Sequence, residues 1–161
     1  MITKLNDPVF GELDQTEWAW IRNYRVSMFG ESKEVELEVE WEEPDILPST
    51  EQQETFLKFD RNKNKCFSDI ENAIYKYYLS ILNNLRNDLG DSADELMPIV
   101  SDVNGLKDLV SLQAIIIKPH YGIWENKIVF LLDCTWDTSL GLGVAMIDNK
   151  VTEVGEQDIV L

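Results

Sequence analysis

Apolar residues and glutamates alternate without interruption in residues 33–41, KEVELEVEW. Every second residue from position 34 is a glutamate, and the residues between them are Val35, Leu37, Val39 and Trp41. A period of two predicts a β-strand that packs one face against a core and exposes the other to water. We therefore expect these apolar side chains to be buried and the glutamates to point into solvent.

A weaker alternation in residues 17–29 predicts a preceding strand. Its larger side chains on one parity are Trp18, Trp20, Tyr24, Val26 and Met28. The segment FGESKE predicts a hairpin turn between the two strands, with Gly30 supplying a positive φ. Tryptophans are expected in the core, although an aromatic pair such as Trp18 and Trp20 is also able to anchor a partner. The short apolar run PVFGEL, residues 8–13, extends this strand-rich first third.

A short helix is predicted in residues 49–59, STEQQETFLKF, after two prolines that end the preceding strand. Ser49 or Thr50 is the candidate N-cap. Gln52 or Gln53 lies three residues further on, at the spacing of a capping box.

A longer helix is predicted in residues 68–90, where Ser68 and Glu71 have capping-box spacing and Gly90 is placed to end the helix. Apolar residues recur at intervals of three and four, which gives one broad stripe. The stripe consists of Ile70, Ala73, Ile74, Tyr77, Tyr78, Ile81, Leu82, Leu85 and Leu89.

The last third returns to strand patterns, in residues 111–119, 126–136, 141–148 and 150–155. The tripeptides at 125–127 and 148–150 have the composition of tight turns between antiparallel neighbours. Strands, two helices and strands again predict an α+β fold, in which the two central helices pack on one face of an antiparallel sheet. At 161 residues the chain is expected to be a single domain, 1–161.

Charge narrows the choice of partner. The chain has 30 acidic and 14 basic residues, and its net charge is −16. This charge repels nucleic-acid phosphates and anionic lipids, so we expect neither nucleic acid nor a membrane surface as a partner. A basic protein is the electrostatic complement, although acidity also serves simply to keep a protein dispersed in solution.

The N-terminal residues lack the basic leader and apolar run of a signal peptide. No apolar stretch approaches the roughly 20 residues that span a bilayer. Cys66 and Cys134 do not form a disulfide framework, and we expect both thiols to be free and reduced. These features together predict a cytoplasmic protein of unspecified oligomeric state.

Motifs for catalysis are sparse, and we expect no catalytic residues, no metal and no cofactor. His120 is the single histidine, and it is expected on the surface. Asp133 and Asp137 would be about 13 Å apart on a regular strand, too far for a pair of glycosidase carboxylates unless a bulge shortens the gap. A small-ligand or hydrolytic site near Asp133, Trp136 and Asp137 is nevertheless the alternative to a binding protein.

A degenerate calcium loop is the third candidate, in residues 60–71, DRNKNKCFSDIE. Positions 1, 3, 5, 9 and 12 of an EF-hand loop would be occupied by Asp60, Asn62, Asn64, Ser68 and Glu71. Position 6 is lysine where that loop uses glycine, and three basic residues surround the expected cation. Both features disfavour calcium.

The row of glutamates has two explanations. It consists of Glu34, Glu36, Glu38, Glu40 and Glu42. Charges on an edge strand prevent pairing with the edge of another molecule. Alternatively, the row is a docking strip for a cationic partner, since residues 34–45 contain seven acids and no base.

The segment WDTSLGLGV, residues 136–144, resembles a signature of a bacterial family of domains of unknown function, Trp-Asp-x-Glu-His-Gly-Leu-Gly-Val. The runs PVFGEL and IYKYY add to this resemblance. The matching residues are Trp136, Asp137, Gly141, Leu142, Gly143 and Val144. Ser139 and Leu140 replace the Glu and His of the family, so the resemblance implies no activity that depends on that histidine.

Such families are similar to small immunity-type proteins that accompany bacterial toxins. The resemblance therefore implies an immunity-like inhibitor, and the acidic strand is its expected contact surface for a basic partner. From the residues alone, Gly141 and Gly143 are expected to shape a turn or bulge after Trp136.

Overall fold

A computed structural model describes residues 3–119 and 126–161. They form one eight-stranded sheet whose strands follow the order of the sequence. The strands are β1 (Lys4–Asp7), β2 (Gly11–Gln15), β3 (Ala19–Met28), β4 (Glu31–Glu40), β5 (Val110–Ile117), β6 (Lys127–Cys134), β7 (Leu142–Ile147) and β8 (Lys150–Gly155).

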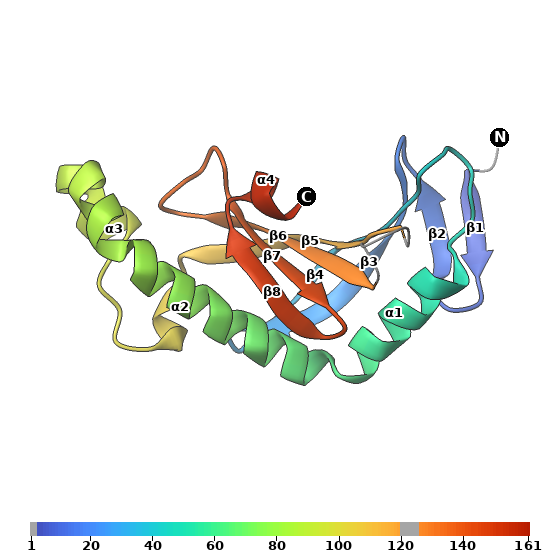
Figure 1. Cartoon of the computed structure of the whole chain (residues 1–161), viewed down its shortest axis with the longest axis horizontal. Coiled ribbons are helices and arrows are strands. Elements are labelled where there is room, and N and C mark those ends of the chain that lie inside the picture. Colours follow the sequence, from blue (N-terminus) through green and yellow to red (C-terminus); the bar gives the residue numbers. More distant parts are fainter. Residues whose placement is uncertain (1–2, 120–125) are drawn as a thin grey trace.

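Neighbouring strands are antiparallel except β4 and β5, which are parallel. A parallel pair needs a long crossover, and the residues between these two strands supply it. The crossover contains α1 (Thr50–Arg61), α2 (Lys63–Leu89), η1 (Gly90–Ser92), α3 (Ala93–Leu96) and η2 (Val103–Leu106). The α+β prediction is confirmed, with the helices α1 and α2 on one face of the sheet (Figure 1).

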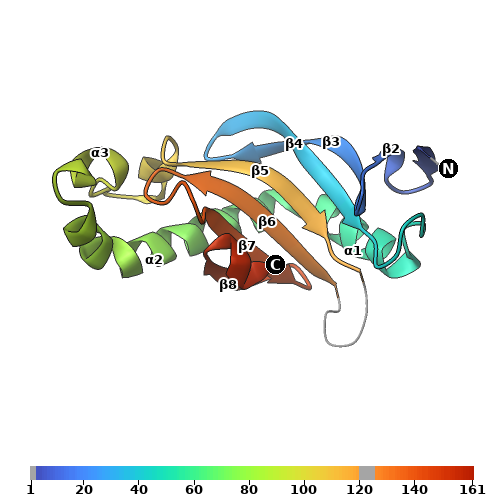
Figure 2. The ribbon, with the colours of Figure 1, turned by 90° about the horizontal axis from the view of Figure 1, so that it is seen from above.

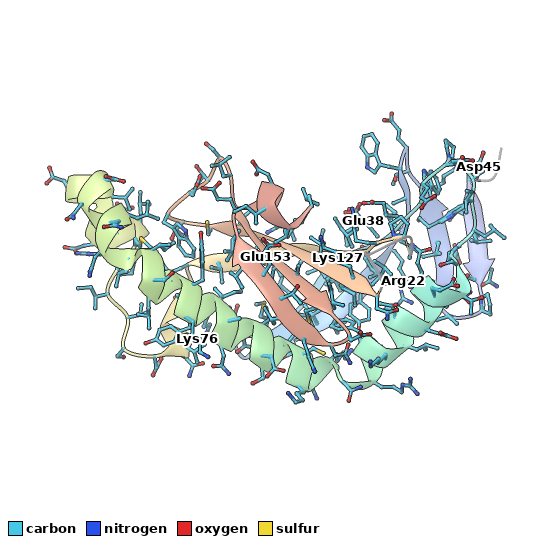
Figure 3. All side chains as sticks on the ribbon, viewed as in Figure 1. Arg22, Glu38, Asp45, Lys76, Lys127 and Glu153 are labelled. Atoms are coloured by element: carbon cyan, nitrogen blue, oxygen red, sulfur yellow. The ribbon has the colours of Figure 1, made fainter. Side chains whose placement is uncertain are left out.

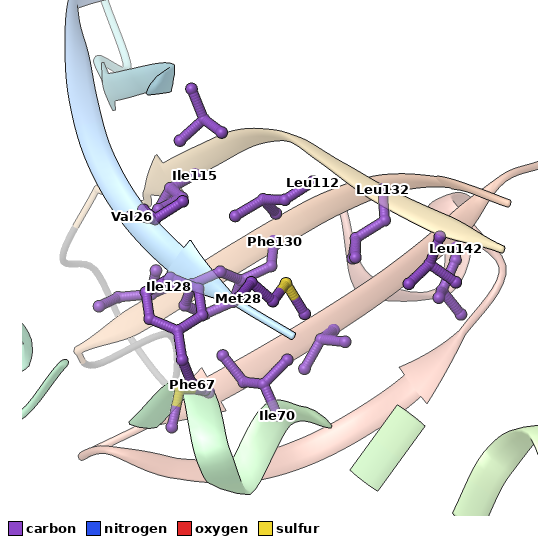
Figure 4. Close-up of a cluster of buried hydrophobic side chains, with 14 of the residues drawn as sticks. Val26, Met28, Phe67, Ile70, Leu112, Ile115, Ile128, Phe130, Leu132 and Leu142 are labelled. Carbon is purple, nitrogen blue, oxygen red and sulfur yellow. The ribbon is translucent and has the colours of Figure 1, made fainter. Parts of the chain in front are cut away.

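The main core lies between that face of the sheet and the two helices. Phe59 of α1, Phe67 of α2 and Phe130 of β6 form an aromatic cluster, with ring centroids 5.7 to 5.9 Å apart. Figure 4 shows Phe67 and Ile70 of α2 directed at the side chains of β6. We call this the inner face of the sheet.

The opposite face, which we call the outer face, carries a second and smaller apolar cluster. The C-terminal helix α4 (Gln157–Val160) lies on this face, and Figure 2 shows it from above. Val160 is fully buried there against Ile116, Val129 and Ala145. The sequence pattern did not predict α4.

Helix α1 begins as the sequence predicts. Ser49 is the N-cap, and its hydroxyl accepts a hydrogen bond from Gln52 N while the Gln52 side chain accepts one from Ser49 N. Gln52 also donates to the backbone oxygens of Glu40 and Ile117, which ties the start of α1 to the ends of β4 and β5.

Helix α2 begins at Lys63 and not at Ser68, so the predicted N-terminus was wrong by five residues. Cys66 and Phe67 are buried and continue the apolar stripe toward the N-terminus, whereas Ser68 is exposed in the second turn of the helix. Burial of this additional turn outweighs the local capping signal.

The predicted turns are confirmed at Gly30 (φ 78°) and at Asp148 and Asn149 (φ 51° and 62°). The apolar run at residues 8–13 is a turn followed by β2, not one continuous strand. Asp7 Oδ1 closes that turn by accepting from Val9 N and Phe10 N, both at 2.9 Å.

Candidate functional site

The glutamates of β4 lie on the outer face of the sheet. Their register partners on β5 are Ala114 beside Glu36 and Ile116 beside Glu38, whereas Leu37 pairs with the inward-facing Ile115. Because β4 pairs with both β3 and β5, it is an interior strand. The explanation of the row as protection of a sheet edge is therefore wrong.

Two glutamates of the row, Glu34 and Glu40, are neutralised within the fold. Glu34 lies 3.6 Å from Arg25 of β3, in an exposed ion pair. Glu40 is more enclosed, and Lys118 Nζ donates to its Oε1 at 2.7 Å. Glu36 and Glu42 are exposed and have no ion pair among the residues that the structure describes.

Glu38 lies in the middle of the row and is half-buried. Burial raises the pKa of its carboxyl to about 7, and the neighbouring Glu36 and Glu40 add to this shift while Lys118 opposes it. A protonated Glu38 is able to donate a hydrogen bond to the Glu36 carboxylate, which contributes to the raised pKa of Glu38.

Two lysines and a further glutamate adjoin this row. Lys127 of β6 is buried, and its burial lowers the pKa of the ammonium group, assisted by Lys118 and opposed by Glu153 and Glu40. Figure 3 shows Glu38, Lys127 and Glu153 contributed by three separate strands.

The raised pKa of Glu38 predicts a pH-dependent cost of folding. The folded state binds this proton more tightly than the unfolded state, whose carboxyl has the ordinary pKa of 4.5. The free energy of unfolding therefore falls as pH rises from about 4.5 to about 7. The full shift corresponds to about 3 kcal/mol, and solvent screening of a half-exposed group reduces the expected effect to about 1 kcal/mol.

We expect Glu38→Gln to raise the free energy of unfolding by about 1 kcal/mol at pH 8 and to change it little at pH 4.5, measured by urea denaturation. Glu43→Gln, at an exposed position, is the control and should be neutral at both pH values. An equal gain from Glu38→Gln at both pH values would show that the carboxyl is not destabilised by ionisation.

An exposed apolar patch lies beyond the end of β4. Trp18 is 62% exposed, Ile46 47% and Leu47 52%, and we call these residues the apolar patch. Ile46 and Leu47 line a hollow of about 180 Å³ together with Trp41, Glu40 and Glu42. The backbone N–H of Trp41 donates to Trp18 O at 3.2 Å, which connects the patch to the acidic row.

Trp18 was expected in the core, and this prediction was wrong. β3 begins at Ala19, so Trp18 lies in the preceding turn, where the alternation of the strand does not apply. Its N–H and that of Ala19 both point at the Thr16 hydroxyl, at 3.4 and 3.1 Å. Trp20, two residues further along the chain, is fully buried and packs edge-on against Trp41.

The alternative site near Asp133, Trp136 and Asp137 does not form a group of converging polar side chains. Trp136 is buried against Tyr78 of α2, with ring centroids 5.0 Å apart. Asp137 Oδ1 accepts from Ser139 N at 3.2 Å and Leu140 N at 3.0 Å, which shapes the turn before β7. Asp133 is exposed on the outer face, away from this turn.

The two signature glycines make room for α4. Gly141 has a φ of 65°, and a Cβ at this residue would lie 2.6 Å from Gln157 Nε2. A Cβ at Gly143 would lie 2.4 Å from Val160 Cγ2. The turn expected at this position is present, and the glycines additionally allow the C-terminal helix to approach β7 closely.

Residues 60–71 do not form a calcium loop. They are helical on both sides of Asn62, so the chain lacks the open turn that would direct five side chains at one cation. Asp60 accepts a hydrogen bond from the Tyr24 hydroxyl at 2.5 Å. Within residues 3–119 and 126–161, no three His, Cys, Asp or Glu side chains are grouped to hold a metal ion.

The remaining predictions concern single residues. Cys66 and Cys134 are both buried free thiols, and burial raises the pKa of each. His120 lies outside the described residues, as does Glu125 of the turn predicted at 125–127. None of the helices in the described ranges is both long and apolar enough to cross a membrane.

Comparison with known proteins places the chain in a family without assigning a function. Residues 9–161 match the sequence profile of a family described as Domain of unknown function (DUF6985). No curated protein and no solved structure matched the chain. Since the match covers nearly the whole chain, including both the acidic strand and the Trp136–Val144 segment, the protein belongs to the DUF6985 family.

Proposed function

We propose that this protein is a non-enzymatic binding protein whose outer face, along β4, docks a basic protein partner. The expected contact residues are Glu34, Glu36, Glu38, Glu40 and Glu42. The observation that carries the proposal is that the exposed carboxylates of Glu36 and Glu42 have no ion pair among the residues that the structure describes, and that Glu42 lines the same hollow as Ile46 and Leu47 of the apolar patch. A net charge of −16 favours fast encounter with a cationic surface.

The apolar patch supplies the apolar anchor residues that an acidic row alone lacks. Binding free energy in protein interfaces is concentrated in a few aromatic or apolar residues that become fully desolvated, surrounded by a polar rim. Trp18, Ile46 and Leu47 are exposed anchors of this kind, and Glu17, Glu42 and Glu43 are exposed beside them. The partner surface that fits combines lysine or arginine residues with an apolar side chain.

The protonation of Glu38 would adjust this surface to the partner. An approaching lysine or arginine favours the ionised carboxylate, so binding would lower the pKa of Glu38 and release a proton near pH 7. The affinity is therefore expected to increase between pH 6 and pH 8. The size of the increase should follow from how far the bound cation lowers the pKa of Glu38.

The resemblance of the signature segment suggests the biological role that such docking would serve. We propose a bacterial, cytoplasmic, immunity-like inhibitor that covers a basic functional surface of a toxin. A toxin gene adjacent to the gene of this protein would supply the partner for direct measurement.

The proposal is tested by charge reversal on the outer face. Glu36→Lys combined with Glu42→Lys should weaken binding to the purified partner by at least about tenfold, and should reduce the dependence of the affinity on salt. Calorimetry at two salt concentrations measures both effects. Trp18→Ala should weaken binding by a similar factor without changing the salt dependence.

The matched control is Asp88→Lys combined with Asp91→Lys, which changes the net charge equally at exposed positions near the end of α2. If both double variants weaken binding to the same extent, only the net charge matters and β4 is not the docking surface. If neither does, the partner binds elsewhere.

A further inference from the structure

A groove on the helix side of the molecule has a charge opposite to that of the chain as a whole. It lies between α2 and the β7–β8 hairpin, has a volume of about 710 Å³, and includes Lys65, Lys76 and Lys150 in its lining. Its acidic lining residues are Asp69 and Asp148. The groove is thus slightly positive in a protein whose net charge is −16.

Both aspartates of the groove already have basic partners. Lys65 Nζ lies 2.8 Å from Asp69 Oδ2, and Lys58 Nζ lies 3.7 Å from Asp148 Oδ1. In the part of the chain that the structure describes, this leaves Lys76 and Lys150 without an ion pair. These two ammonium groups, one from each wall, are available to an anion.

Hydrogen bonds hold the wall formed by the β7–β8 turn in place. Asn149 Nδ2 donates to Lys58 O at 3.1 Å, which ties the β7–β8 turn to the end of α1. Asn126 Nδ2 donates to Asp148 Oδ1 at 2.8 Å and ties the same turn to the start of β6. The turn itself is compact, with positive φ at its two central residues. This wall of the groove is therefore fixed by contacts with α1 and with the start of β6.

The opposite wall comes from one face of α2. Its lining residues recur at helical spacing and are Asn62, Lys65, Cys66, Asp69, Asn72, Ala73 and Lys76. The amides of Asn62 and Asn72 are both donors and acceptors, which suits hydroxyl groups on a ligand. Cys66, Ala73 and Val151 give the groove a partly apolar floor.

We propose that this groove binds a small organic phosphate, with Lys76 and Lys150 contacting the phosphate and the asparagine amides contacting the hydroxyls of the attached group. Lysine is a common phosphate ligand in proteins, acting as a point charge. The volume lies within the ~300–1,000 Å³ of small-molecule sites. The groove lies across the sheet from the acidic row, as the positions of Lys76 and Glu38 in Figure 3 show, so this binding is independent of the proposed partner.

Titration with ribose 5-phosphate, followed by amide NMR shifts, tests the proposal. We expect shifts at residues 148–151 and 72–76, and tighter binding than that of inorganic phosphate, which cannot use the amides. Lys76→Gln combined with Lys150→Gln should weaken binding by roughly tenfold. Asn72→Asp, which adds a negative charge at an exposed position, should weaken binding similarly.

Lys107→Gln is the control, because Lys107 pairs with Glu31 at 3.2 Å and does not line the groove. Equal weakening by this control would reduce the effect to non-specific charge attraction and overturn the proposal. No shift at millimolar ribose 5-phosphate, or shifts of equal size with inorganic phosphate, would overturn it as well. Glu36→Lys with Glu42→Lys should leave these shifts in place, which separates this test from that of the partner surface.

Discussion

Replacement of Phe130 by alanine is expected to lower the free energy of unfolding by about 3–5 kcal/mol. Phe130 is fully buried at the point where β6 meets both long helices, and its ring packs against those of Phe59 and Phe67. Figure 4 shows Phe67 and Phe130 in this core. Removal of the ring leaves a cavity that neither helix is able to fill without losing its other contacts. Urea denaturation measures the loss as a lower midpoint at unchanged slope.

The matched control is Leu79→Ala on the same helix layer, where the side chain is 46% exposed. Its cost should stay below about 1 kcal/mol, since little apolar surface is withdrawn from water there. A cost for Phe130→Ala no greater than that of Leu79→Ala would mean that α1 and α2 are not packed on β6 as described.

Hydrophobic periodicity predicted most of the fold because most strands here have one buried face. Val35, Leu37 and Val39 are buried as the alternation requires, and the four strands of the last third begin and end within a few residues of their predicted bounds. Periodicity identifies which face of an element is buried, but not which strand lies beside it. The parallel pairing of β4 and β5 was therefore not predicted.

That missing pairing changes the interpretation of the glutamate row. With β4 inside the sheet, Glu38 and Glu40 have neighbours on both sides, and burial of Glu38 follows from strand order and not from its own sequence. Lys118 and Lys127, which belong to the same surface, are far from residue 38 in the chain and carry no local signal. The charges were visible in the sequence, whereas their partners were not.

The apolar patch and the lysine groove were missed for a similar reason. Ile46 and Leu47 fall between two prolines in a segment with no periodicity, so no rule assigns them a face. The groove joins α2 residues up to Lys76 to a turn that begins more than seventy residues later, at Asp148. The sequence predicted only the turn at residues 148–150, as a connection between two strands and not as part of a ligand site.

The signature glycines permit the second prediction of large effect, because they couple β7 to the C-terminal helix. We expect Gly143→Ala to lower the free energy of unfolding by about 2–3 kcal/mol. A Cβ there would lie 2.4 Å from Val160 Cγ2 and 3.3 Å from Gln157 Cα, so α4 must move away from the sheet. Its departure would expose the small cluster of Ile116, Val129 and Ala145 on the outer face.

A double-mutant cycle with Val160→Ala isolates this contact. The shorter side chain removes the 2.4 Å clash, so the two substitutions together should cost about 1 kcal/mol less than the sum of the single costs. Gly155→Ala is the control on the neighbouring strand, because the closest atom to its Cβ would be the terminal Cδ1 of Ile159, at 3.0 Å, and Ile159 is 53% exposed. Full additivity in the cycle, or an equal cost for Gly155→Ala, would mean that α4 does not pack closely against β7 at Gly143. A coupled result would instead make Gly143 of the signature a structural requirement for holding the C-terminus on the sheet, independent of any chemistry at positions 139 and 140.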